Sequence, residues 1–169
     1  VNDELELVTR HSHPMIIAGD STWHDYKVEF EFSPKAKDDK CGLVFKYHNN
    51  RCYYFYGMEG NRLVLKVVNH ATAPHRPFEK VLVSTPFDWE PGRVYKGDVS
   101  IRGNQIFTLL DDNESLNMVA EDNTYFRGKV GFLSDVPADF YQLKVSALHN
   151  VQRKISRYKS QKVNASLTL

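Results

Sequence analysis

The stretch that most constrains the fold is CGLVFKYHNNRCYYFYGMEGNRLVLKVV, residues 41–68. It contains three runs of strand-favouring aromatic and aliphatic residues separated by two polar, turn-forming segments. The first segment, His48-Asn49-Asn50-Arg51, and the second, with two glycines and an Asn within residues 57–61, tolerate the left-handed backbone of hairpin turns. We therefore expect an antiparallel meander at the centre of a sheet.

The rest of the chain repeats this pattern of short strands and turns. Residues 26–32, YKVEFEF, alternate most cleanly, with aromatic or aliphatic side chains on one face and charged ones on the other. Further strand-like runs lie at residues 3–9, 15–19, 78–85, 95–102, 105–110, 116–119, 129–133 and 140–147. Turn signals recur every 8 to 12 residues, and no helical periodicity precedes residue 147. This pattern predicts an all-β, two-sheet antiparallel sandwich.

The last 22 residues differ from the rest. Leu148, Val151, Ile155 and Tyr158 follow a spacing of 3, 4 and 3, which predicts one short amphipathic helix with a basic exposed side. We expect a β-sandwich module over residues 1–147, and a helix and linker over 148–169 leading toward a further domain. Because the chain starts at Val1 without a leader, it is expected to be a mature protein or an excised fragment.

Composition and charge exclude several classes of partner. The 169 residues suit one domain with a sizeable core, and no apolar run is long enough to span a membrane. Five of the basic residues fall in 149–169 without an acid, so the first 148 residues carry a net charge of −4 against an overall +1. A nucleic-acid or membrane partner is therefore not expected. Cys41 and Cys52 lie at opposite ends of one predicted hairpin, so we expect two free thiols.

An ordered series of motifs covers residues 15–147. It comprises Trp23-x-x-Tyr26-x-Val28-x-Phe30-x-Phe32, Cys41-Gly42-Leu43-Val44-Phe45-Lys46-Tyr47, Tyr53 to Tyr56 with Gly60-Asn61-Arg62-Leu63, Gly92-Arg93-Val94-Tyr95 with Val99, Ile101, Gly103 and Asn104, Gly128-x-Val130-Gly131-Phe132, and Phe140-x-x-x-Lys144-Val145. Together these resemble the laminin G-like, concanavalin A-like jelly-roll modules attached to bacterial polysaccharide lyases and glycoside hydrolases. The resemblance implies a jelly-roll sandwich.

The resemblance also implies a function. It favours a non-catalytic carbohydrate-binding module of a larger, exported polysaccharide-degrading enzyme, placed in the periplasm, at the cell surface or outside the cell. The expected partners are a plant or algal polysaccharide or oligosaccharide, acidic ones included, and a neighbouring catalytic domain of the same chain. Two alternatives stay open: a structural module that packs on that catalytic domain without binding free sugar, and a glycan-degrading enzyme in its own right.

One departure from the family pattern concerns calcium. In many relatives the closing motif has an Asp after its Phe that helps to hold a structural calcium, whereas Tyr141 stands there in this chain. Asp135, Asp139 or Glu4 would have to replace it, because calcium accepts varied oxygen ligands. We expect no cofactor.

Catalytic and metal-binding patterns are weak in this sequence. The E-x-D-x-x-E strand of concanavalin A-like glycosidases is absent; its nearest approach is Glu29 and Glu31, with Pro34 at the third acidic position. Two adjacent acids on a strand rarely flank one glycosidic bond, so we expect a solvated sheet face. His11-x-His13 lacks further ligands at metal-binding spacing, so no metal site is expected.

The candidate ligand site is the aromatic hairpin. Sugar rings stack their C–H faces on Tyr and Trp, and polar residues at the rim bind the hydroxyls or carboxylates. Alternation sends half of these aromatic side chains to the core, and a one-residue shift in register exchanges which half is exposed. We predict a patch of Tyr47, His48, Arg51, Tyr54, Tyr56 and Arg76. Trp23 and Trp89, which lie in loops, are expected to plug the ends of the sandwich.

Overall fold

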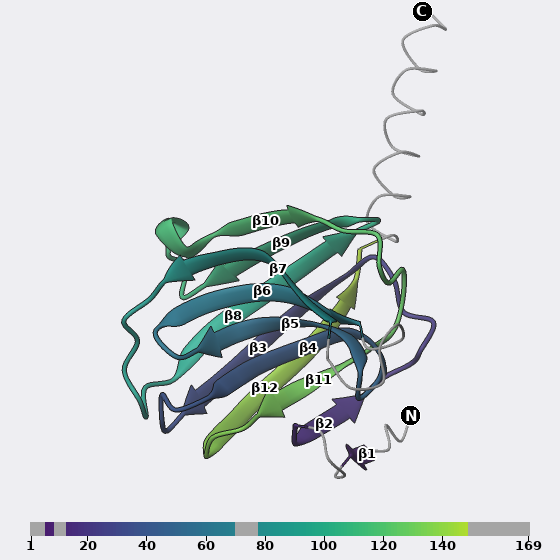
Figure 1. Cartoon of the computed structure of the whole chain (residues 1–169). Helices are drawn as coiled ribbons and strands as arrows, with labels where there is room; N and C mark the ends of the chain where they lie inside the picture. Colours follow the sequence, from purple (N-terminus) through teal and green to yellow (C-terminus); the bar gives the residue numbers. More distant parts are fainter. Residues whose placement is uncertain (1–5, 9–12, 70–77, 149–169) are drawn as a thin grey trace, which may run out of the picture.

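A computed structural model describes residues 6–8, 13–69 and 78–148, and these form twelve strands in two antiparallel sheets (Figure 1). The seven-stranded sheet consists, in spatial order, of β1 (Glu6–Val8), β2 (Met15–Ala18), β11 (Lys129–Ser134), β4 (Lys40–Asn49), β5 (Cys52–Glu59), β6 (Arg62–Asn69) and β7 (Phe78–Pro86). The five-stranded sheet consists of β10 (Met118–Glu121), β9 (Gln105–Leu110), β8 (Tyr95–Arg102), β3 (Tyr26–Pro34) and β12 (Ala138–Ala147). The prediction of an all-β, two-sheet sandwich is confirmed.

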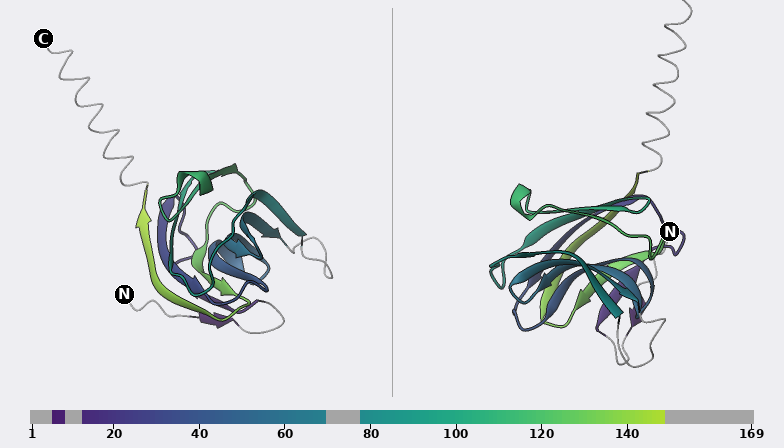
Figure 2. Two further views of the ribbon diagram at one scale, coloured as in Figure 1. Left: turned by 90° about the vertical axis from the view of Figure 1, so that its left-hand side faces the viewer. Right: turned by 45° about the horizontal axis from the view of Figure 1, so that its top comes forward.

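The core lies between the two sheets, which form separate curved layers when seen end-on (Figure 2). Phe30 of β3 packs edge-on against Tyr56 of β5 and Phe132 of β11, with ring centroids 6.2 and 6.1 Å apart. Because Phe30 belongs to the five-stranded sheet and the other two to the seven-stranded sheet, these contacts join the layers. They also fix which side chains of β5 point inward.

The predicted meander of residues 41–68 is β4, β5 and β6, which pair in that order at the centre of the larger sheet. The first turn is tight, since Asn49 pairs directly with Cys52. A bulge interrupts β4 between Phe45 and Asn49, and Lys46 within it has a φ of 45°. The bulge matters for function because it changes which face the following residue, Tyr47, occupies.

Helical structure among the described residues is limited to one 3₁₀ turn, Glu114–Leu116, which Asn113 caps by accepting the Ser115 N–H. None of the described helices has the length and hydropathy needed to cross a membrane. The predicted C-terminal helix and linker over 148–169 lie outside the described part of the chain except for Leu148, so the helix and the predicted domain division stay predictions.

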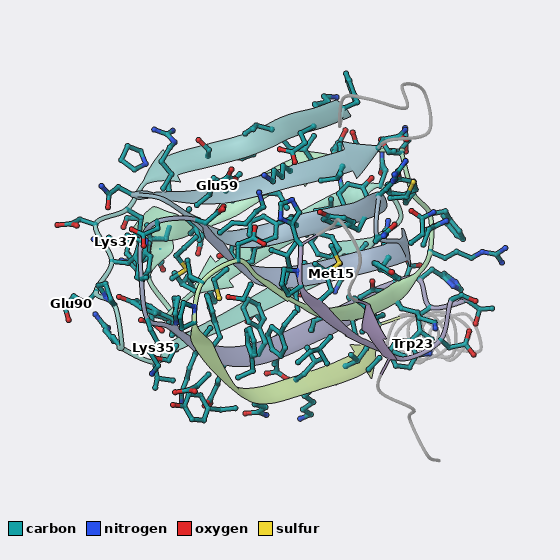
Figure 3. The ribbon with its side chains drawn as sticks, turned by 60° about the horizontal axis from the view of Figure 1, so that its bottom comes forward. Met15, Trp23, Lys35, Lys37, Glu59 and Glu90 are labelled. Carbon is teal, nitrogen blue, oxygen red and sulfur yellow. The ribbon has the colours of Figure 1, made fainter. Side chains whose placement is uncertain are left out.

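The two tryptophans lie in loops, as predicted. Trp89 is buried in the core and donates its indole N–H to Gly60 O at 2.7 Å. Trp23 is partly buried against the core and meets Tyr26 edge-on. In Figure 3, Trp23 lies at the opposite end of the sandwich from Glu90, the neighbour of Trp89. Both cysteines are free thiols, which confirms that prediction.

Candidate functional site: the outer face of the seven-stranded sheet

The most unusual polar arrangement lies on the face of the seven-stranded sheet that points away from the core. Lys66 occupies the middle of β6 between Leu65 and Val67, which are core residues, so its side chain points outward. It is nevertheless only 2% exposed. Its Nζ donates to Glu59 Oε2 at 2.8 Å and to Glu79 Oε2 at 3.0 Å. We call these three residues the Glu59–Lys66–Glu79 group.

Three adjacent strands bring this group together. Glu59 ends β5 opposite Arg62, the first residue of β6, and Glu79 lies near the start of β7 opposite Val68. Lys66 is between these two levels of the sheet, so its flexible side chain reaches both carboxylates. Glu59 is labelled in Figure 3, which also labels Met15 of β2.

Charge and exposure differ sharply within the group. The ammonium is removed from water, and two carboxylates offset the cost of its desolvation. The carboxylates themselves keep side-chain exposures of 38% for Glu59 and 32% for Glu79. Because both bonded oxygens lie within 3.0 Å of one nitrogen, they are less than about 6 Å apart. The group therefore presents two fixed, partly exposed acceptors side by side.

A buried layer of apolar and aromatic side chains lies beside the group on the same face of the sheet. We call it the outer-face cluster; it consists of Met15, Ile17, Val44, Tyr47, Tyr53, Phe55, Val68 and Leu133. Lys66 Nζ lies 5.4 Å from the centroid of the Phe55 ring, within the range of a cation–π contact. The rings of Tyr47 and Tyr53 stack at 6.4 Å. Burial raises the pKa of the Tyr53 hydroxyl, and the nearby Glu79 carboxylate adds to the shift.

The predicted stacking role of Tyr54 and Tyr56 is wrong in this structure. Both are 0% exposed and lie in the core, because alternation places them on the opposite face from Tyr53. Tyr54 stacks on Phe45 at 5.3 Å and donates its hydroxyl to Asp122 Oδ1 at 2.5 Å. Neither tyrosine has a ring face left for a ligand.

The other predicted site residues do not form one patch. The bulge at Lys46 puts Tyr47 on the outer face, away from Tyr54. His48 and Arg51 are exposed at the β4–β5 turn; the His48 Nε2–H donates to Arg127 O at 2.7 Å, and Arg51 donates its backbone N–H to Asn49 Oδ1. Arg76 lies outside the described residues. Carbohydrate contact by Tyr47, His48, Arg51 or Arg76 stays a prediction.

The predicted patch lacked all three members of the Glu59–Lys66–Glu79 group. The available signal was a lysine inside the otherwise aliphatic run LVLKVV, residues 63–68. Such a residue on a central strand needs acidic partners. Glu59 comes from the neighbouring β5 by the β5–β6 pairing, whereas Glu79 depends on the β6–β7 pairing, whose strands are joined by residues 70–77.

Glu29 and Glu31, the catalytic candidates in the sequence, lie on the outer face of the five-stranded sheet. Glu29 and Glu31 have side-chain exposures of 43% and 26%, and they pair with lysines: Glu29 with Lys27 and Lys144, Glu31 with Lys96. This is the solvated face expected from the sequence.

The candidate metal ligands among the described residues lie beside basic side chains. Within residues 6–8, 13–69 and 78–148 no three His, Cys, Asp or Glu side chains gather as a metal would require. His13 Nδ1 lies 2.6 Å from Asp135 Oδ2, and Lys35 Nζ lies 2.8 Å from Asp139 Oδ2, so both candidate calcium ligands already have basic partners. His11 and Glu4 fall outside the described residues. The expectation of no cofactor remains a prediction.

Comparison with solved structures identifies the architecture. The carbohydrate binding module CBM66 from Bacillus subtilis superposes with a TM-score of 0.69 at 15% identity, over 86% of this chain and 92% of that one. Chicken galectin 2 gives 0.56 at 10% identity, over 74% and 93%, and lactose-liganded congerin II gives 0.51 at 11% identity, over 72% and 90%. The chain has the concanavalin A-like sandwich fold. The resemblance inferred from the motifs is thus confirmed for the fold.

Sequence comparison adds one relative. An extracellular exo-α-L-arabinofuranosidase of Streptomyces chartreusis is 28% identical over 100 residues, which is 59% of this chain but 12% of that enzyme. The chain therefore matches a small part of that relative's length. None of the known family models matches the chain.

Proposed function

We propose that this sandwich is a non-catalytic carbohydrate-binding module and that the Glu59–Lys66–Glu79 group is the polar centre of its ligand site. The observation that carries the proposal is the pair of fixed, partly exposed carboxylates on the outer face of the seven-stranded sheet. Carboxylates accept hydrogen bonds from vicinal hydroxyls, and charge-assisted bonds are the strong ones. The fold shared with a carbohydrate binding module and with a lactose-liganded protein supports this assignment.

The charge of the group favours a neutral sugar. Two carboxylates and one ammonium leave a net charge of −1, and the ammonium is already bonded to both acids. A uronate at this position would meet the net negative charge of the group. Arabinose-containing polysaccharides are the first ligands to test, since the matching enzyme is named an arabinofuranosidase. The expected acidic plant or algal glycan, held by Arg51 and Arg76, is the competing proposal.

A catalytic role is disfavoured by the position of the lysine. Glycosidases place a sugar between two carboxyl groups, which need ~5 to 9.5 Å of separation to flank the bond. Here Lys66 Nζ itself lies between the two carboxylates and bonds to both. Binding through the outward-facing oxygens needs no such space.

The wider context of the module is part of the proposal. We infer an exported protein in which this sandwich accompanies a glycan-degrading catalytic domain, as the resemblance implied. The match to a short part of an extracellular glycosidase supports this context. The module would then work in the periplasm, at the cell surface or outside the cell.

Retention on polysaccharides tests the proposal. Affinity gels and calorimetry would compare arabinose-containing polysaccharides, a β-galactan and polygalacturonate. Glu59→Gln and Glu79→Gln keep side-chain shape but remove charged acceptors, so each is expected to weaken binding about 10- to 100-fold. Glu31→Gln, on the other sheet, is the matched control and should bind normally. Wild-type affinity in folded Glu59→Gln and Glu79→Gln variants would reject this site.

A further inference from the structure

We propose a second sugar-binding subsite at one end of the sandwich, built on the exposed ring of Phe126. Three connections meet there: the β2–β3 loop, the β8–β9 turn and the β10–β11 loop. Phe126, on the β10–β11 loop, is 62% exposed and stacks on His24 of the β2–β3 loop, with ring centroids 5.2 Å apart and planes at 24°. We call this arrangement the Phe126 platform. It rests on the proposed function, because both sites would bind the same polysaccharide.

Hydrogen bonds between the three connections hold the platform in place. Gly128 N–H donates to Trp23 O at 3.0 Å, and Gly103 N–H donates to Asp25 Oδ1 at 2.6 Å. Asp122 N–H donates to Asn104 O at 2.9 Å, which ties the β10–β11 loop to the β8–β9 turn. Each connection is thus bonded to another, so little conformational entropy remains to be lost on binding.

Both neighbours of Phe126 are also fixed. Tyr125 donates its hydroxyl to Val68 O at 3.0 Å, and Arg127 O accepts from His48. Gly128 follows with a φ of 153°, and a Cβ there would come within 2.4 Å of the Lys46 carbonyl carbon. An exposed aromatic ring on so constrained a loop is a preorganised contact surface.

A cavity of about 280 Å³ borders the ring and supplies polar partners. Asn104, Asp122, Asn123 and Phe126 line it together with Gly103 and Tyr125. The Asn104 and Asn123 side-chain amides have no hydrogen bond to any described residue, whereas Asp122 accepts from Tyr54 and Thr124 and lies 3.6 Å from Lys80 Nζ. A volume near the lower end of ligand pockets, ~300 Å³, suits one sugar ring.

The chemistry of this cavity fits a sugar better than an apolar peptide. One face of the Phe126 ring is covered by His24, which leaves the rest of the ring to stack on C–H groups. The two side-chain amides can both donate and accept, so hydroxyls on one sugar would find several partners. An apolar partner would bury these polar groups unpaired, at a free-energy cost.

The test compares variants on the polysaccharide that the wild-type protein retains. Phe126→Ala is expected to weaken affinity about threefold to tenfold, Asn123→Ala to weaken it less, and Phe126→Trp to preserve it. Val119→Ala is the control, because Val119 is equally exposed at 61% but lies on β10. Wild-type affinity in folded Phe126→Ala and Asn123→Ala variants would overturn the subsite.

A second measurement separates failure of this subsite from failure of the proposed function. Titration of the wild-type protein with free arabinose and galactose is expected to shift the side-chain amide NMR signals of Asn104 and Asn123. Such shifts without retention on any polysaccharide would support the subsite and reject the polysaccharide-binding function. The opposite result would reject the subsite alone. In that case Glu79→Gln would lower polysaccharide retention, Phe126→Ala would not, and free sugar would leave both amide signals unchanged.

Discussion

The two faces of the seven-stranded sheet are made by alternate residues of the same strands, yet they are buried for different reasons. On β5, Tyr54 and Tyr56 face the other sheet, while Tyr53 and Phe55 face away from it. Exposure does not separate them, since all four are at most 2% exposed. The charged group does: only the outer face places Lys66 against two carboxylates that solvent still reaches. The burial of an aromatic side chain therefore does not show whether it belongs to the core or to a ligand site until the face of the sheet that it occupies is known.

The largest expected effect is on the core face. Tyr54→Ala removes a fully buried ring and the hydroxyl that donates to Asp122, so it should lower the free energy of unfolding by ~3 to 5 kcal/mol. Tyr54→Phe removes only the hydroxyl and should cost ~1 to 3 kcal/mol by leaving Asp122 without that donor. Denaturant unfolding measures both. Near-wild-type stability of Tyr54→Ala would place this ring outside the core.

The next effect is on the outer face and couples stability to binding. Lys66→Met leaves Glu59 and Glu79 facing each other without their cation, which should cost ~1 to 3 kcal/mol, less than for a fully buried ion pair because both carboxylates are partly exposed. Adding Glu59→Gln and Glu79→Gln to Lys66→Met removes the repulsion and should recover most of that stability.

The polysaccharide affinity of this triple variant should not recover with its stability. The variant lacks the charged acceptors, so binding should stay lost although the fold is restored. If the triple variant regained affinity together with stability, the group would be structural rather than a ligand site. Calorimetry on both variants beside Lys96→Met, an exposed lysine of the other sheet, makes the comparison.

The sequence predicted the fold well because its signals are local. Alternation and turn residues placed nearly every strand, and the motif order indicated the concanavalin A-like architecture. The site was harder because it depends on register. A bulge at Lys46, which no local pattern marked, set the face of Tyr47, and the partners of Lys66 come from two other strands. The Phe126 platform likewise joins three connections that are far apart in sequence.

A smaller expected effect is on stability at low pH, through Asp122, which accepts from the core residue Tyr54 and lines the cavity beside Phe126. Although burial raises the pKa of Asp122, hydrogen bonds from Thr124 and Tyr54 outweigh it and hold this pKa below its ordinary value. A lowered carboxyl pKa in the folded state contributes stability above the ordinary Asp pKa, and this is lost as pH falls through the folded-state value. Melting temperatures of wild type and Asp122→Asn should therefore differ at pH 6, and the difference should shrink as the pH falls below the ordinary Asp pKa of about 3.9. A constant difference across this range would contradict the assignment.

The smallest expected effect is a difference in labelling rate between the two thiols, which reports which face of the sheet each one occupies. Cys41 lies in the core on β4, where burial raises the pKa of its thiol to about 11, whereas Cys52 is partly exposed beside the turn. Since the thiolate is the reactive form, Cys41 should have about 100-fold less thiolate than an ordinary cysteine at pH 8, and burial slows it further. Cys52→Ser and Cys41→Ala isolate each thiol for maleimide labelling followed by mass spectrometry. Slow labelling of Cys41 that becomes fast in denaturant is the expected result, and equal native rates for the two thiols would contradict the inward orientation of this part of β4.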